Sequence, residues 1–96
     1  SARAVLVETD TGLEVATAIF PYPDGVIDEY VPGTDIRLGQ DWALQNPMDY
    51  LEALQKLIPE LLVATKVKPE DVIGIGIDFT ACTVLPVDRS GVPLWQ

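Results

Sequence analysis

The fold class is decided by one stretch, Val72-Ile73-Gly74-Ile75-Gly76-Ile77-Asp78-Phe79. Its β-branched residues predict a strand in which the isoleucines share one face and the glycines and Asp78 share the other, because side chains alternate along a strand. Two glycines on one face leave a flat strip that a backbone or a ligand can approach closely. In open α/β sheets, ligands bind where such strands end. The segment that follows, Thr80-Ala81-Cys82-Thr83, is therefore the first candidate site.

Two shorter strands and a helix are predicted before this stretch. Ala4 to Val7 and Glu14 to Phe20 flank the turn formers of Glu8 to Gly12, which predicts a β-hairpin. A helix is predicted to begin at Asn46-Pro47, because Asn is a good N-cap and proline suits the first turn. Its buried face is expected to carry the apolar residues that recur at spacings of three and four, namely Leu51, Leu54, Ile58, Leu61 and Leu62.

A long connection and a short final strand complete the predicted order. The connection between hairpin and helix has no helical or alternating period, and loops of this length are usually functional or flexible. It carries much of the negative charge of the chain: its basic residue is Arg37, and its acidic residues include Asp24, Asp28, Glu29, Asp35 and Asp41. Thr83 to Asp88 predicts another strand, turned back by Asp88-Arg89-Ser90-Gly91. This order predicts an α/β or α+β fold with a mixed sheet and a flanking helix.

Composition excludes several classes of partner. The chain has 96 residues, and fifteen acidic against six basic side chains give a net charge of −9. Nucleic-acid binding needs clustered Lys and Arg, so we expect none, and the same sign disfavours an anionic membrane surface. The lone Cys82 forms no internal disulfide, and a zinc site needs several Cys or His ligands. No apolar run resembles a membrane span or a signal peptide, so we expect a cytoplasmic location.

Common catalytic motifs are missing. Gly74-Ile75-Gly76 is no dinucleotide fingerprint, because Phe79 stands in place of the third glycine, and there is no Walker A loop. Without any histidine, Ser-His and Cys-His pairs cannot form within the chain. The segment from Asp78 to Thr83 remains, and it has a plainer interpretation. Asp78 and Thr80 can bond the local backbone of a turn while Cys82 packs as a small apolar residue.

The residues at both ends of the chain lead us to expect that it is a piece of a longer protein. Ser1-Ala2-Arg3 enters an apolar strand almost at once, and Trp95 lies one residue from the end. Domains usually keep apolar residues away from frayed ends. A small processed protein is the alternative.

Four blocks of the sequence resemble the opening of a known family, the FGGY carbohydrate kinases. They are residues 1–7, residues 21–30 with Pro21-Tyr22-Pro23-Asp24-Gly25, residues 38–45, and residues 72–83 with Asp78-Phe79-Thr80-Ala81-Cys82-Thr83. The resemblance is strongest to the members that phosphorylate L-ribulose. It implies a ribonuclease H-like, actin-like ATPase fold. It also implies transfer of the γ-phosphoryl group of ATP, with Mg²⁺, to the terminal hydroxyl of the sugar in arabinose catabolism.

The resemblance also implies roles for individual residues. Family members place a Gly-Thr-x-Ser loop against the nucleotide phosphates, and its tail matches Ser1-Ala2-Arg3, so Ser1 and Arg3 are expected at the edge of the phosphate site. Relatives that act on xylulose or glycerol contact the sugar at positions matching Ala81 and Cys82. With Thr80, these two residues are the expected sugar-binding set, and their small size would leave room for a different ketose.

The catalytic base and the main adenine-binding segment of the family lie downstream, so no catalytic or metal-binding residue is expected in this chain. Residues 1–96 would be part of the N-terminal kinase domain, lacking its first strand and everything after Gln96, and inactive alone. Two alternatives stay open: another FGGY-type kinase with a different sugar, and a non-catalytic acidic binding module that uses the loop from Tyr22 to Gln45. Whether the whole protein forms a homo-oligomer is also left open.

Overall fold

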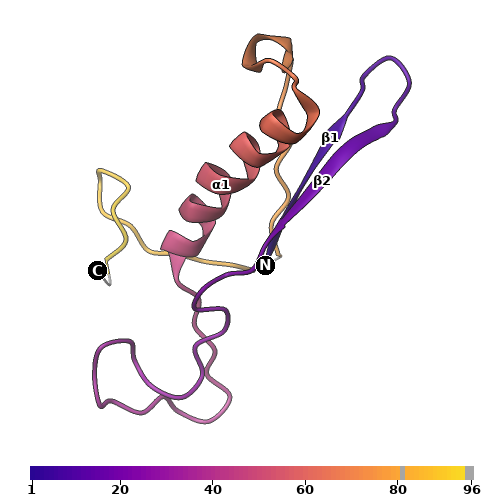
Figure 1. The fold of residues 1–96 in the computed structure, drawn as a ribbon. Coiled ribbons are helices and arrows are strands. Elements are labelled where there is room, and N and C mark those ends of the chain that lie inside the picture. The colour runs from indigo at the N-terminus through magenta and orange to yellow at the C-terminus, as the bar shows by residue number, and fades with distance from the viewer. Residues whose placement is uncertain (81, 95–96) are drawn as a thin grey trace.

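The computed structural model describes residues 1–80 and 82–94, in which one helix packs against a β-hairpin. The hairpin consists of β1 (Ala2–Val7) and β2 (Glu14–Phe20), and the helix is α1 (Pro47–Thr65). A short 3-10 helix, η1 (Pro69–Asp71), follows α1. Figure 1 shows α1 lying alongside the hairpin, with the long connection between β2 and α1 looping out at one end. In this described part of the chain, no helix combines the length and apolar character needed to span a membrane.

The predicted hairpin is confirmed. β1 and β2 are antiparallel, with Ala2 opposite Phe20 and Leu6 opposite Ala16, and a β-bulge lies between Leu6 and Val7. The turn is closed by the Glu8 amide, which donates to the Leu13 carbonyl over 2.9 Å. Local turn chemistry thus determines this part of the fold.

The core lies between α1 and one face of the hairpin. Ala53, Leu57 and Leu61 of α1 are buried against Ala18 of β2. Partly buried side chains surround these four residues: Ala2, Ala4, Leu6, Ala16, Phe20 and Tyr22. Because alanines predominate on the inner face of the hairpin, α1 can lie close to both strands. Burial of this small apolar cluster is the main interaction that holds helix and hairpin together.

The predicted buried face of α1 is partly wrong. Leu61 is buried and Leu62 is half-buried, but Leu51, Leu54 and Ile58 are exposed. Apolar residues cover more than one side of this helix, so spacing alone could not select the buried side. The hairpin selects it instead, because its short alanines pack best against the side of α1 that also carries an alanine.

The predicted helix start at Asn46 is confirmed. The Asn46 side-chain oxygen accepts a hydrogen bond from the Met48 amide over 3.0 Å, which satisfies one of the unpaired donors of the first turn. The Asn46 side-chain amide donates to the Asp24 carboxylate over 2.5 Å. Asn46 therefore connects α1 to the beginning of the long connection.

The strand predicted from Val72 to Phe79 is wrong for the described structure. These residues are extended, but the sheet has only the two antiparallel strands β1 and β2, not the predicted mixed arrangement. No backbone hydrogen bond joins residues 73–79 to another described residue, and Ile73 is 81% exposed. β-propensity is realised only when a neighbouring strand pairs with the backbone. The segment does run back from α1 toward the start of β1 (Figure 1).

The strand predicted from Thr83 to Asp88 is also missing, whereas the turn after it is confirmed. The Asp88 carbonyl accepts from the Gly91 amide over 3.0 Å, and the Asp88 side chain accepts from the Ser90 amide over 2.7 Å. A single antiparallel bridge joins Val87 and Pro93. The turn is a local feature, and it forms without a sheet around it.

Candidate functional site

A groove of about 750 Å³ lies between β1, α1 and the extended segment 72–80. Its walls are mostly apolar, from α1 and from the isoleucines of the segment. Its polar lining residues include Ser1 and Arg3 at the start of β1, and Asp78 and Thr80 at the end of the segment. Figure 1 shows these two chain segments converging. An apolar groove with a few polar groups at one end is typical of a small-molecule site.

The structure brings together three of the five predicted site residues. Ser1, Arg3 and Thr80 line the same groove, although Ser1 and Thr80 are far apart in sequence. Cys82 is exposed and is not part of the groove lining. Ala81 lies outside the described residues. The expected contacts with sugar and phosphate remain predictions for all five.

Beyond the groove, two local features are seen at Cys82 and Thr83. Cys82 adopts a left-handed backbone conformation with φ of 63°, and the Thr83 hydroxyl donates to the Thr80 carbonyl over 3.0 Å. In the plainer interpretation from the sequence, Asp78 and Thr80 bond the local backbone and Cys82 packs as a small apolar residue, but Cys82 is exposed. Among the described residues, the side chains of Asp78 and Thr80 have no hydrogen-bond partner, so their polar atoms can serve a ligand.

Sequence reasoning missed an aromatic wall beside the polar end of the groove. Tyr50, in the first turn of α1, contacts Tyr22 edge-on with ring centroids 5.3 Å apart. It also contacts Phe79 edge-on, with centroids 5.8 Å apart. All three rings line the groove. Tyr22 lies beside the Asp24-Gly25 turn, Tyr50 lies in the predicted helix, and Phe79 directly precedes Thr80. Only the fold shows that Tyr50 contacts both of the other rings.

A buried carboxylate lies near this wall. Asp49 is 3% exposed, and one of its carboxylate oxygens has no hydrogen-bond partner among the described residues. Burial raises the pKa of Tyr22 above the ordinary value of 10.0, and the nearby Tyr50 and Asp49 add to the shift. All three effects disfavour a phenolate at Tyr22. Tyr22 therefore stays neutral, as a hydrogen-bonding phenol, throughout the physiological range.

This shift predicts how stability depends on pH. Because the folded-state pKa of Tyr22 is raised, the stabilisation by its neutral form is complete below the unfolded pKa and is lost as the pH rises through the folded pKa. We expect the urea midpoint of the purified protein to fall above about pH 10, and Tyr22→Phe to lessen this fall while changing little near about pH 8. Tyr30→Phe in the long connection is the matched control. Identical curves for Tyr22→Phe and the unmodified protein above about pH 10 would contradict the assignment.

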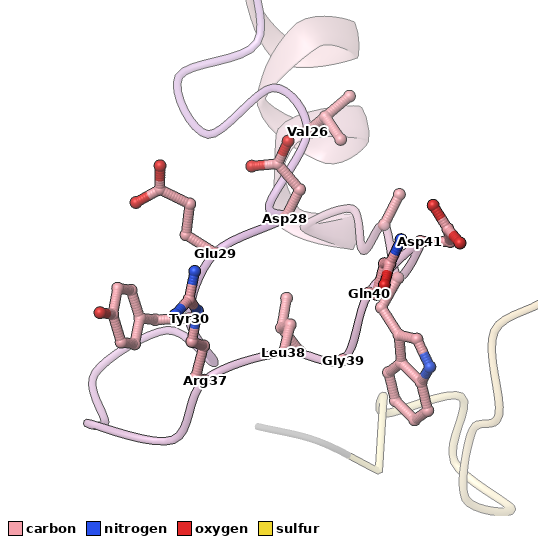
Figure 2. A pocket seen from close by; sticks show the side chains of 11 residues that line it. Val26, Asp28, Glu29, Tyr30, Arg37, Leu38, Gly39, Gln40 and Asp41 are labelled. Atoms are coloured by element: carbon pink, nitrogen blue, oxygen red, sulfur yellow. The ribbon is translucent and has the colours of Figure 1, made fainter.

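The long connection forms a second hollow, shown in Figure 2. Two antiparallel bridges fold the connection on itself, one between Ile27 and Leu44 and one between Tyr30 and Arg37. Acidic and aromatic side chains surround the hollow together with Arg37, and they include Asp28, Glu29, Asp41, Tyr30 and Trp42. Within residues 1–80 and 82–94, no three His, Cys, Asp or Glu side chains gather closely enough to hold a metal ion. The hollow shares only Val26 with the groove.

The described residues form a small α/β unit with an apolar groove, and comparison with known proteins identifies what the chain resembles. No protein-family model matches the chain. The chain is, however, 56% identical to the ribulokinase of Bacillus licheniformis and 53% identical to that of Halalkalibacterium halodurans, in each case over 94 residues. It is 42% identical over 97 residues to the ribulokinase of Mycolicibacterium smegmatis.

These similarities extend over nearly the whole chain but over a small part of each relative. The first two alignments cover 98% of the chain and the third covers all of it, whereas each covers 17% of the relative. The chain thus spans 17% of the length of these curated relatives. The resemblance indicated by the sequence blocks is confirmed, and it is a resemblance to ribulokinases.

Proposed function

We propose that the whole protein is an ATP-dependent kinase that converts L-ribulose to L-ribulose 5-phosphate in arabinose catabolism, in the cytoplasm. The observation that carries this proposal is the 56% identity to a ribulokinase over 98% of the chain. The geometry supports it, because Thr80, expected at the sugar, lines the same groove as Ser1 and Arg3, which are expected at the phosphates. L-Ribulose and ATP are the proposed small-molecule partners.

In this proposal, Thr80, Ala81 and Cys82 line the sugar pocket, and Ser1 and Arg3 lie at the edge of the phosphate site. An uncharged sugar is recognised by hydrogen bonds and shape, which a threonine hydroxyl and small neighbours can provide. Phosphoryl transfer requires the sugar hydroxyl to lie close to the γ-phosphate, in line with the bond that breaks. The convergence of Arg3 and Thr80 on one groove end would place the two substrates side by side.

We further propose that the chain is part of the N-terminal domain of a ribonuclease H-like kinase, whose first strand precedes Ser1 and whose remainder follows Gln96. Among the described residues, β1 pairs only with β2, and residues 73–79 make no backbone hydrogen bonds. The groove separates these two extended backbones. A strand in the groove could pair with both of them and cover the exposed isoleucines, which would complete a mixed sheet.

The polar end of the groove fits ATP and Mg²⁺ in part. Arg3 offers a guanidinium that can bind phosphate oxygens, and Asp78 offers one carboxylate. One carboxylate suits a magnesium ion that is held mainly by phosphates and water. When bound, the ion neutralises phosphate charge. The catalytic base would come from beyond Gln96, so the 96-residue chain is not expected to catalyse the reaction.

The test is a substrate panel with the purified full-length protein, in which ATP consumption is measured with L-ribulose, xylulose, glycerol and other polyols. We expect the highest kcat/KM for L-ribulose, with one ATP consumed for each sugar. A clear preference for another sugar would favour the alternative of a different FGGY-type kinase. If no ATP is consumed with any of the sugars, the kinase assignment is overturned and the acidic binding module remains.

A further inference from the structure

The segment that ends the groove has few attachments to the rest of the structure. Residues 73–79 make no backbone hydrogen bond to another described residue, and the hydrogen bond from Thr83 to Thr80 lies within the turn itself. The edge-on contact between Tyr50 and Phe79 joins this segment to α1. Because Phe79 immediately precedes Thr80, the contact acts on the residue next to the proposed sugar pocket.

Tyr50 is itself held firmly. It lies in the first turn of α1, which Asn46 caps. Its ring contacts Tyr22 on a second side, and its hydroxyl donates a hydrogen bond to the side-chain oxygen of Gln45. Phe79, in contrast, is 59% exposed. The contact thus joins a ring that has several partners to a segment that makes few other contacts among the described residues.

We propose that Tyr50 is a positioning residue for the sugar site, acting through Phe79 on the backbone at Thr80. This inference rests on the proposed function. The ring of Tyr50 limits where Phe79 can lie, and Phe79 in turn limits how far the Thr80 hydroxyl can move from the sugar. Loss of the ring would loosen the sugar pocket while leaving the phosphate-side residues Ser1 and Arg3 in place, because these are carried by the hairpin.

The experiment measures steady-state kinetics of the full-length protein and of Tyr50→Ala and Tyr50→Phe. An edge-on aromatic pair contributes enough free energy for its loss to matter severalfold. We expect Tyr50→Ala to raise the KM for L-ribulose about tenfold with the KM for ATP unchanged, and Tyr50→Phe to stay within about twofold, because phenylalanine keeps both ring contacts. Met48→Ala, in the same turn of α1 but outside the groove, is the matched control.

A double-mutant cycle with Phe79→Ala distinguishes this role from a general loss of structure. If Tyr50 acts through Phe79, adding Tyr50→Ala to Phe79→Ala should produce no further rise in the KM for L-ribulose. Additive rises, or equal rises in the KM for ATP and for L-ribulose, would overturn the inference. An unmodified protein that is inactive on L-ribulose would instead overturn the proposed function, so the two failures are distinguishable.

Discussion

Replacing Leu57 with alanine is expected to destabilise the protein by about 3 kcal/mol, since this is the middle of the range for truncating a buried leucine. Leu57 is 3% exposed and lies at the centre of the contact between α1 and the hairpin, with Ala53, Leu61 and Ala18 around it. Two of the other three core residues are alanines, whose side chains are too short to fill the cavity that the truncation leaves. The change should shift the urea midpoint at constant slope.

The matched control for this experiment is Val63→Ala, on the same helix. Val63 is 79% exposed, so its truncation should change stability by no more than about 0.5 kcal/mol. Equal losses for Leu57→Ala and Val63→Ala would mean that the packing of α1 on the hairpin is not what stabilises this region. Both variants are truncations to alanine on one helix, and because valine is the poorer helix former, the change at Val63 can only gain in helix propensity.

Replacing Ala81 with arginine in the full-length protein is expected to raise the KM for L-ribulose by about 30-fold or more, because overfilling a fitted pocket costs about 1–3 kcal/mol. The family resemblance implies a sugar-contacting side chain at this position. Ala81→Met should also raise the KM for L-ribulose, but by a smaller factor. The measurement is KM for L-ribulose at saturating ATP.

Ser90→Arg is the matched control for the arginine substitution. Ser90 lies in the exposed turn from Asp88 to Gly91 and uses its backbone amide, not its side chain, to hold that turn. We expect Ser90→Arg to leave the KM unchanged. Unchanged kinetics for Ala81→Arg as well would remove Ala81 from the sugar site.

The parts of the fold that could be predicted from sequence are those governed by local interactions. The hairpin follows from turn formers between two apolar runs, and the helix start follows from the capping geometry of Asn46. The Asp88 turn formed as predicted for the same reason. Strand formation from Val72 to Phe79 does not depend on local interactions alone, because a strand forms only if another backbone pairs with it.

The buried face of α1 shows a second limit. Leu54 and Ile58 have the spacing of a core face, yet they are exposed in the groove, whereas Leu57 is buried in the core against the hairpin. Both sides of the helix are apolar, so periodicity indicated a buried helix without indicating which side the hairpin would cover. In the proposed fold, a strand in the groove would bury the second side as well.

The candidate site was predicted from two separate parts of the sequence, and Ser1, Arg3 and Thr80 from these parts line one groove. Ser1 and Arg3 were identified through the family resemblance, as was the sugar-binding role of Thr80. Tyr50 and Tyr22 could not be identified from sequence, because nothing in the local pattern shows that the first turn of α1 contacts Phe79. Contacts between residues distant in sequence emerge only from the packing of α1 on the hairpin.

The most direct test of this account is a crystal structure of the full-length protein with L-ribulose and a non-hydrolysable ATP analogue. The account predicts that the sugar lies at the polar end of the groove and contacts Thr80, Ala81 and Cys82, with its terminal hydroxyl directed toward the γ-phosphate near Ser1 and Arg3. Sugar bound elsewhere, with none of these five residues in contact with either substrate, would contradict it.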